Sequence, residues 1–260
     1  MSDDMNNEIT EQLVSQTAGK VYDDIAHPAI QATGQIVSFI PRSIRVLLGK
    51  WEKWIVNGEY AIKETEKLLE KKLEDIPADK IVEPEPYVAI PAIQQLSYSL
   101  DSEELREMYA NLLASSMNKD TKINVHPSYV DIIKQLCPDE AKLLKFLSNK
   151  EAQPLIDIHF NRPNNSGFES VLRNFTSIAE SVCENQSEIF SYLDNLERLK
   201  LIKIYDDIKL MDDSEYKPLE EHPRIKMIMN QPVKDGASYE IQRHLFELTA
   251  FAKNFIKICL

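Results

Sequence analysis

The fold is decided by the stretch IVEPEPYVAIPAIQQLSYSLDSEELREMYANLLASSM (residues 81–117) and its continuation NKDTKINVHPSYVDIIKQLCPDEAKLLKFL (residues 118–147). Together they predict four short helices, because a helix-start signal precedes each one. Asp101 and Glu104 have the spacing of a capping box, in which each side chain accepts a hydrogen bond from a backbone N–H near the other. Prolines suit the first turn of a helix, where an N–H has no intrahelical partner. They stand at the heads of the other three helices: Pro91, Pro127 and Pro138.

Apolar residues in this stretch recur with helical spacing, which predicts that one face of each helix is buried. These stripes consist of Leu105, Met108, Tyr109, Leu112, Leu113, Ser116, Tyr129, Ile132, Ile133, Leu136, Leu143, Leu144 and Leu147. The whole chain has only six glycines among its 260 residues, which also favours helix. This length is sufficient for a full core and for two modest domains.

The overall charge and the cysteines narrow the class of protein. A formal net charge of −12 opposes non-specific binding to nucleic acid, because such binding depends on neutralising phosphates. Three cysteines lie far apart, none in a CxxC motif, and the N-terminus is acidic rather than a signal peptide. We therefore expect reduced thiols and a cytoplasmic protein. No apolar run approaches the ~20 residues that span a bilayer.

The composition predicts three parts in order along the chain. Residues 1–24 form an acidic tail leading into a weak helix. Residues 25–137 form a helical domain, which includes a second helix at 59–75 and an extended, proline-rich link up to Pro91. Residues 138–260 form a winged-helix-like domain. The expected fold class is mainly α, with an N-terminal helical bundle followed by an α+β domain that holds a small β-sheet.

A basic amphipathic helix is predicted at about 40–56. Its apolar face carries both tryptophans of the chain, and its basic side chains gather opposite. Two interpretations stay open. The apolar face packs on the protein core, or the helix lies in the headgroup region of a membrane with its basic side chains toward anionic lipid. The candidate membrane or partner face consists of Arg42, Arg45, Leu47, Leu48, Lys50, Trp51, Lys53, Trp54 and Ile55.

The C-terminal part changes in pattern. We expect an alternating run at 155–160, a helix at 168–183, a helix at 189–200 leading directly into a strand or tight hairpin at 201–211, and a final strand and helix at 239–260. The sequence NLERLKLIKI resembles the third helix and wing of a winged helix, and ELTAFAKNFIKIC resembles the last strand and closing helix of such domains.

The charges of this part oppose a DNA-reading role. A winged helix that reads DNA needs basic side chains on its recognition helix and wing. The candidate helix 186–200 instead has a net charge of −1, and acidic residues dominate the candidate wing: Asp206, Asp207, Asp212, Asp213 and Glu215. A winged-helix shape here therefore predicts protein contact rather than DNA binding.

No catalytic, cofactor or metal site is predicted. The five histidines are scattered without HExxH or HxxxH spacing, and no phosphate-binding loop, GxGxxG or GxSxG motif occurs. The acidic wing lacks the glycine-containing loop of a Ca²⁺ site. We expect neither a cofactor nor a metal, and we expect the protein not to be an enzyme.

One family resemblance adds a function. The run from IVEPEP to PDEAKLLKFL resembles the bacterial abortive-infection alpha (Abi-alpha) family, most specifically in the EP pair, ELREMYANLLASSM, HPSYVDIIKQL and PDEAKLLKFL. The resemblance covers roughly residues 60–260, and its second half is looser. It implies a role in bacterial defence against phage, by sacrifice or arrest of the infected cell, and it implies no catalytic residues.

The leading hypothesis is thus a non-enzymatic anti-phage protein that acts through protein contacts or self-association. A peripheral contact of the 40–56 helix with the inner membrane is part of this hypothesis. The alternative is a winged-helix transcriptional regulator that binds DNA.

Overall fold

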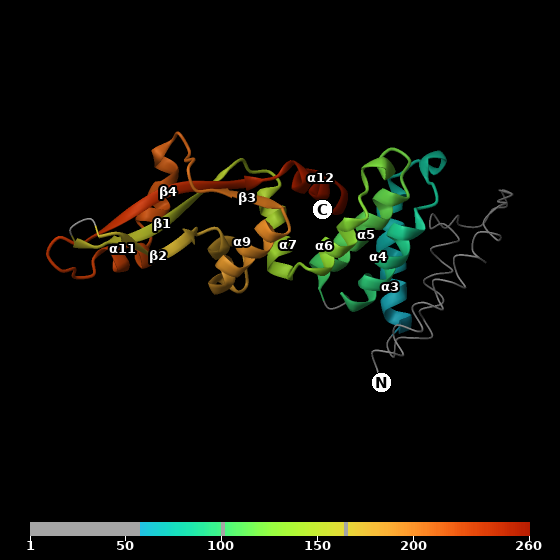
Figure 1. Ribbon diagram of the computed structural model, residues 1–260. Helices are drawn as coiled ribbons and strands as arrows, with labels where there is room; N and C mark the ends of the chain where they lie inside the picture. Colours follow the sequence, from blue (N-terminus) through green and yellow to red (C-terminus); the bar gives the residue numbers. More distant parts are fainter. Residues whose placement is uncertain (1–57, 100–101, 164–165) are drawn as a thin grey trace, which may run out of the picture.

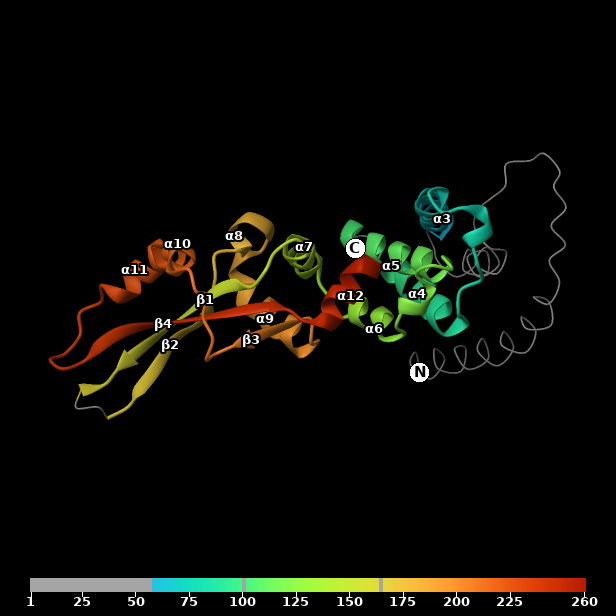
Figure 2. The same cartoon turned by 90° about the horizontal axis from the view of Figure 1, so that it is seen from above.

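The computed structural model describes residues 58–99, 102–163 and 166–260. Within these ranges the chain forms ten α-helices and one four-stranded antiparallel sheet, so the mainly helical α+β class is confirmed. The molecule is elongated, with a helical end around α3–α6 and a sheet end around β1, β2 and β4 (Figures 1 and 2). Short 3-10 turns occur at Ala78–Lys80, Lys122–Asn124, Gln186–Glu188 and Asp213–Tyr216.

The helical end is organised around α5. This end contains α3 (Gly58–Glu74), α4 (Pro86–Tyr98), α5 (Glu103–Ser116) and α6 (Ser128–Lys134). Helix α5 contacts α3, α4, α6, α7 and α12, and seven of its residues are buried. With α7, these elements confirm the four short helices predicted between 81 and 147, and the helix predicted at 59–75 is α3.

Two predicted helix starts are shifted. Helix α4 begins at Pro86 rather than Pro91, because Val88 and Ala89 already belong to its buried face. Pro91 lies inside α4, where it removes the N–H that would bond to the Tyr87 carbonyl. Helix α5 is capped by Ser102 rather than Asp101: the Ser102 hydroxyl accepts a hydrogen bond from the Leu105 N–H.

The sheet end begins after α7 (Pro138–Leu147). Its strands are β1 (Gln153–Asn161), β2 (Phe168–Phe175), β3 (Ile202–Tyr205) and β4 (Ser238–Leu248), in the spatial order β2-β1-β4-β3. The strands predicted at 155–160 and at the start of 239–260 are therefore confirmed, and so is the helix predicted at 189–200 that leads into a strand. Of the strand or tight hairpin predicted at 201–211, only Ile202–Tyr205 is a strand, because only these residues pair with β4. The helices of this end are α8 (Ala179–Val182), α9 (Ile189–Arg198), α10 (Lys217–Glu220), α11 (Pro223–Met229) and the final α12 (Ala250–Cys259).

The helix predicted over 168–183 is wrong for most of its length. Residues 168–175 form β2, and only α8 is helical within that range. Strand β2 follows a turn in which Gly167 has a φ of +108°, and it pairs antiparallel with β1. This pairing satisfies the backbone groups of β2 that face β1, whereas a helix of mostly exposed residues would have buried little apolar surface.

Two apolar cores hold the molecule together. The larger core is continuous from Leu69 in α3 to Cys259 in α12, and it includes Leu155 and Phe246 on one face of the sheet. The smaller core lies on the other face, where Ile156 and Ile158 of β1 pack against residues of the β3–β4 connection such as Tyr216, Leu219 and Ile225. Figure 2 shows α10 and α11 over this face.

Helix α12 brings the end of the chain back to the helical end. The Asn111 side chain donates hydrogen bonds to the Cys259 and Leu260 carbonyls, and the Ser115 hydroxyl donates to the Ile258 carbonyl. These bonds satisfy carbonyls that a helix C-terminus leaves without intrahelical partners. The domain boundary at 137/138, the helical-bundle description and the winged-helix description stay predictions.

Candidate functional site

The predicted membrane or partner face lies outside the described residues. All nine of its members fall within 42–55: Arg42, Arg45, Leu47, Leu48, Lys50, Trp51, Lys53, Trp54 and Ile55. The described structure therefore brings none of them together. The same holds for the predicted acidic tail at 1–24.

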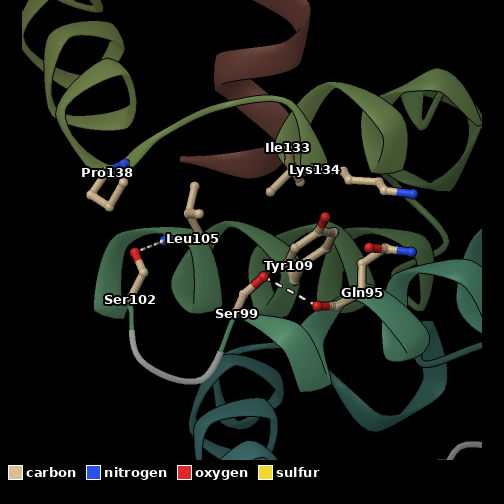
Figure 3. Close-up of a pocket in the computed structure, with 8 residues that line it drawn as sticks. All are labelled: Gln95, Ser99, Ser102, Leu105, Tyr109, Ile133, Lys134 and Pro138. Atoms are coloured by element: carbon tan, nitrogen blue, oxygen red, sulfur yellow. Dashed lines mark hydrogen bonds between the residues drawn. The ribbon is translucent and has the colours of Figure 1, made fainter.

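A groove of about 790 Å³ lies between the end of α4, the start of α5, the end of α6 and the start of α7 (Figure 3). Its volume is within the ~300–1,000 Å³ range of small-molecule pockets. Its lining is mainly apolar, and we call this site the groove. It is lined by Gln95, Ser99, Ser102, Leu105, Tyr109, Ile133, Lys134 and Pro138.

Most polar groups of the groove are already occupied by local hydrogen bonds. The Ser99 hydroxyl donates to the Gln95 carbonyl, and the Ser102 hydroxyl caps α5. The Tyr109 hydroxyl donates to the Val130 carbonyl, and burial raises the pKa of Tyr109, so it stays neutral. Only the Gln95 amide and the Lys134 ammonium extend along the mouth of the groove (Figure 3). The groove is therefore suited to apolar side chains rather than to proton transfer.

A buried polar cluster joins α7 to α9. Asp139, in the first turn of α7, accepts hydrogen bonds from the Glu184 and Asn185 N–H groups and from the Tyr192 hydroxyl. Burial by itself would raise the pKa of Asp139, but these hydrogen bonds and the Lys142 ammonium together lower it. The carboxylate therefore stays charged and holds the chain between α8 and α9 against α7.

Glu140 completes this junction. Its carboxylate accepts hydrogen bonds from the Cys137 N–H and from the Asn195 side-chain amide. Asn195 also donates to the Gln135 carbonyl, and Arg198 donates to the Gln135 side chain. Asn195 and Arg198 of α9 are thus engaged within the chain rather than directed outward.

A second buried polar cluster lies in the sheet. The carboxylate of Asp157 accepts a hydrogen bond from the Asn174 N–H, and His244 Nε2 lies 3.1 Å from Asn174 Oδ1 and 3.6 Å from Asp157 Oδ1. Asn174 has a φ of +53°, and the register between β1 and β2 is irregular around it. The cluster therefore holds a bulge in β2.

The charge state of His244 follows from its burial. The residue is only 2% exposed, and burial lowers its pKa, while Asp157 and Asp206 act in the opposite direction. We infer that His244 is neutral near pH 7. With Nε2 as the donor to Asn174 Oδ1, its arrangement is that of a structural polar pair rather than of an activated nucleophile.

The described residues contain neither a metal-binding cluster nor a membrane-spanning helix. No group of three or more His, Cys, Asp or Glu side chains in 58–99, 102–163 and 166–260 is placed so that it could hold a metal ion. Across the same ranges, none of the helices has the length and hydropathy needed to cross a bilayer.

These observations define a mainly helical α+β protein with an apolar groove and two buried polar clusters. The sequence profile of the family described as "Abortive infection alpha" matches residues 57–259. Because the match covers most of the chain, the chain belongs to this family, and the predicted resemblance is confirmed. The description of this family refers to abortive infection.

Other comparisons add little. No curated protein matches the chain significantly. One solved structure, described as an uncharacterized protein from the hydrocarbon-degrading marine bacterium Alcanivorax borkumensis SK2, is similar over 54% of this chain and 94% of that chain, with 16% identity and a TM-score of 0.30. A likeness at this TM-score supports no conclusion about function.

The groove and both polar clusters were missed by sequence reasoning. His244 and Asp157 are 87 positions apart in the numbering and meet only because β1 pairs with β4. Asp139 and Glu140 were visible as acids in the first turn of a helix, but their distant partners were not. The groove forms where the ends of four helices come together. No local feature of the sequence predicts such a contact.

Proposed function

We propose that this chain is a non-enzymatic anti-phage protein of the abortive-infection type, acting through protein contacts made mainly by its sheet end. Family membership supports the defence role. The observation that carries the protein-contact part is the distribution of exposed apolar side chains. Among the described residues nine large hydrophobic side chains are exposed, and six of them belong to the sheet end: Phe168, Val171, Ile208, Met211, Met227 and Val233.

These six residues, which we call the sheet-end apolar residues, sit on segments suited to recognition. Met211 is fully exposed and Met227 is 65% exposed. Methionine is flexible and polarisable, so it adapts to a partner surface at low cost. A contiguous patch of exposed apolar side chains is typical of an interaction site, and we propose that Met211 and Met227 belong to one. The start of β2, α11 and the loop after α11 lie at the end of the molecule farthest from α3 (Figure 1).

A winged-helix arrangement of α7–α9, β1, β3, β4 and α12 is part of this proposal. The order β1-β4-β3, with the last strand in the middle, supports it, and β2 then stands as an added edge strand. The connection at the wing position, 206–237, is long and contains α10 and α11. It packs back on the sheet through Tyr216 and Leu219 instead of extending outward.

The same arrangement disfavours the DNA-binding alternative. In a DNA-reading winged helix the recognition helix directs polar and basic side chains to base edges. Here Asn195 and Arg198 of α9 bind the 135–140 turn. The wing-position segment 206–237 holds eight acidic and five basic residues, which would repel phosphates.

The absence of catalysis is also part of the proposal, and the polar clusters support it. Asp157, His244 and Asn174 contact one another and hold the β2 bulge, and Asp139 holds the α8–α9 connection. Each buried acid therefore has a structural role.

An infection experiment tests the protein-contact role. Bacteria that express the wild-type chain are compared with bacteria that express the double variant Met211→Asp, Met227→Asp. We expect the wild type to limit phage yield while infected cells stop growing, and we expect the double variant to lose this protection. Because both side chains are exposed, the unfolding midpoint of the purified double variant should match that of the wild type. Full protection by the stable variant would contradict the proposed contact.

Two binding experiments separate the other hypotheses. In a mobility-shift experiment at low salt, a protein–DNA complex would support the alternative and contradict this proposal. Peripheral membrane contact is tested by flotation with anionic vesicles, using chains with and without residues 36–57. Flotation that requires these residues supports the contact, and equal behaviour of both forms removes it.

A further inference from the structure

We propose that the wing-position segment 206–237 forms a two-fold interface with a second copy of this chain. In this interface the acidic half of the segment, residues 206–216, meets the basic half of the other copy, residues 223–234. The inference rests on the proposed function, because it names the partner that Met211 and Met227 contact.

The two halves carry opposite charges. The acidic half holds five acidic residues and one basic residue, which gives a net charge of −4. The basic half holds three basic residues and no acidic residue, which gives a net charge of +3. Opposite charges attract and like charges repel across an interface. Two copies of the chain therefore approach most favourably when the acidic half of each faces the basic half of the other.

Charged side chains of both halves are available to a partner. Within the described residues, the ion pairs of the acidic half join Asp213 to Lys209 and to Arg243. This leaves three exposed carboxylates without an ion-pair partner in the described chain: Asp206, Asp207 and Glu215. In the basic half, Lys226 and Lys234 are exposed, and no ion pair among the described residues includes them. These charges can therefore meet opposite charges on a second copy.

Each half also presents apolar side chains to solvent. In the acidic half, Ile208 is 47% exposed and Met211 is fully exposed. In the basic half, Met227 is 65% exposed and Val233 is 41% exposed. Contact between the two halves removes these side chains from water, which is the main favourable contribution to association. The charges then set the orientation of the two copies.

Both halves lie over the same face of the sheet. Leu210 and Tyr216 of the acidic half pack on the second core. Ile225 and Ile228 of the basic half pack on the same core. Helix α10 contacts both the Asp213–Tyr216 turn and α11, and Figure 2 shows α10 and α11 side by side. One rotation by 180° therefore brings each half against the opposite half of the second copy. Such a contact closes on itself, so it predicts a dimer rather than a filament.

Sedimentation equilibrium of the full chain tests this dimer. We expect the wild type to dimerise with increasing concentration, and more weakly as salt rises. One variant reverses the acidic half (Asp206→Lys, Asp207→Lys, Glu215→Lys) and another reverses the basic half (Lys226→Glu, Lys234→Glu). Each variant alone brings like charges together, so its dimer should be weaker by about tenfold or more. An equimolar mixture of the two variants should recover the dimer, because both contacts then join opposite charges again.

The matched control is Lys71→Glu, Lys119→Glu, which makes the same change in net charge as the basic-half variant, on exposed lysines of the helical end. It should dimerise like the wild type. All substituted side chains are exposed, so every variant should keep the wild-type unfolding midpoint. A wild type that is monomeric at every concentration would overturn the proposal. A dimer that both reversals leave intact, or a variant mixture that stays monomeric, would also overturn it.

The infection experiment with Met211→Asp, Met227→Asp decides the proposed function separately. A monomeric wild type together with lost protection in that variant would keep the protein-contact role and assign it to a different partner. A dimer that behaves as expected, together with full protection by the methionine variant, would separate self-association from defence.

Discussion

The two ends of the molecule differ in how completely they bury their large apolar side chains. At the helical end, α5 is surrounded by five other helices, and Tyr87 and Ile123 are large apolar side chains left exposed there. The sheet end has the thinner second core and carries six of the nine exposed large hydrophobic side chains among the described residues. Under the proposed function, the helical end serves as a platform and the sheet end meets a partner.

The buried carboxylates of Asp139 and Asp157 also differ in how their charges are stabilised. Asp139, where the two ends join, accepts three hydrogen bonds and faces Lys142, so its charge is stabilised from several directions. Asp157 in the sheet shares its site with His244, whose charge depends on pH. We therefore expect a larger loss of unfolding free energy when Asp139 is replaced than when His244 is replaced.

The largest expected effect is at the junction. Asp139→Ala leaves two buried N–H groups and the Tyr192 hydroxyl without their acceptor, so we expect the free energy of unfolding to fall by about 3 kcal/mol. Urea denaturation measures this. The control Glu184→Ala removes only the exposed partner of Lys142 and should cost less than ~1 kcal/mol. Equal costs for the two variants would show that Asp139 does not hold the junction.

A smaller effect is expected at the second core. The Tyr216 hydroxyl accepts a partly buried hydrogen bond from the Leu210 N–H and donates a buried one to the His244 carbonyl. Tyr216→Phe should therefore cost about 1–2 kcal/mol in urea denaturation. Tyr239→Phe is the matched control, because its hydroxyl donates to Gln231 at the surface and its loss should be nearly neutral. A neutral Tyr216→Phe would mean that the wing-position segment is not held by this contact.

A third effect concerns the return of α12 to the helical end. Asn111→Ala removes the donor to the Cys259 and Leu260 carbonyls, which water then solvates in part, so we expect a loss of about 1 kcal/mol. Amide hydrogen exchange should become faster in the last turn of α12 and stay unchanged in α3. Faster exchange in both helices would argue against a local capping role.

The smallest expected effect is a pH dependence in the sheet. Burial places the folded-state pKa of His244 below its ordinary value of 6.5, so the unfolded chain binds the proton first as the pH falls. The stabilisation is complete above about pH 6.5 and is lost as the pH falls through the folded-state pKa. The groups that face His244 in this window are Asp157, Asp206, Arg173 and His159. His244→Gln should flatten the stability profile below about pH 6.5, and an unchanged profile would contradict this role.

At the α7–α9 junction, stability also depends on pH, but at lower pH than for His244. The folded-state pKa of Asp139 is below its ordinary value of 3.8, so its contribution is lost only as the pH falls below about 4. The two losses begin at different pH values, about 6.5 for His244 and about 4 for Asp139, so one titration of stability follows both.

Local helices were easier to predict from the sequence than contacts between residues that are far apart in the chain. The four helices between 81 and 147 were correct because prolines and apolar spacing are local signals, as in α7, where Pro138 stands at the start and Leu143, Leu144 and Leu147 are buried. Strand β2 was missed because FESVLRNF carries a helix-compatible pattern and becomes a strand only beside β1. The groove, the Asp139 junction and the Asp157–His244 cluster were missed because each joins residues of distant segments.

The most direct test compares the two ends in one infection measurement. Phage yield is measured in cells that express either Met211→Asp, Met227→Asp at the sheet end or Tyr87→Asp, Ile123→Asp at the helical end, since all four side chains are exposed. We predict that only the sheet-end variant loses protection while both purified proteins keep the wild-type unfolding midpoint. Lost protection in the helical-end variant with full protection in the sheet-end variant would contradict the assignment of recognition to the sheet end.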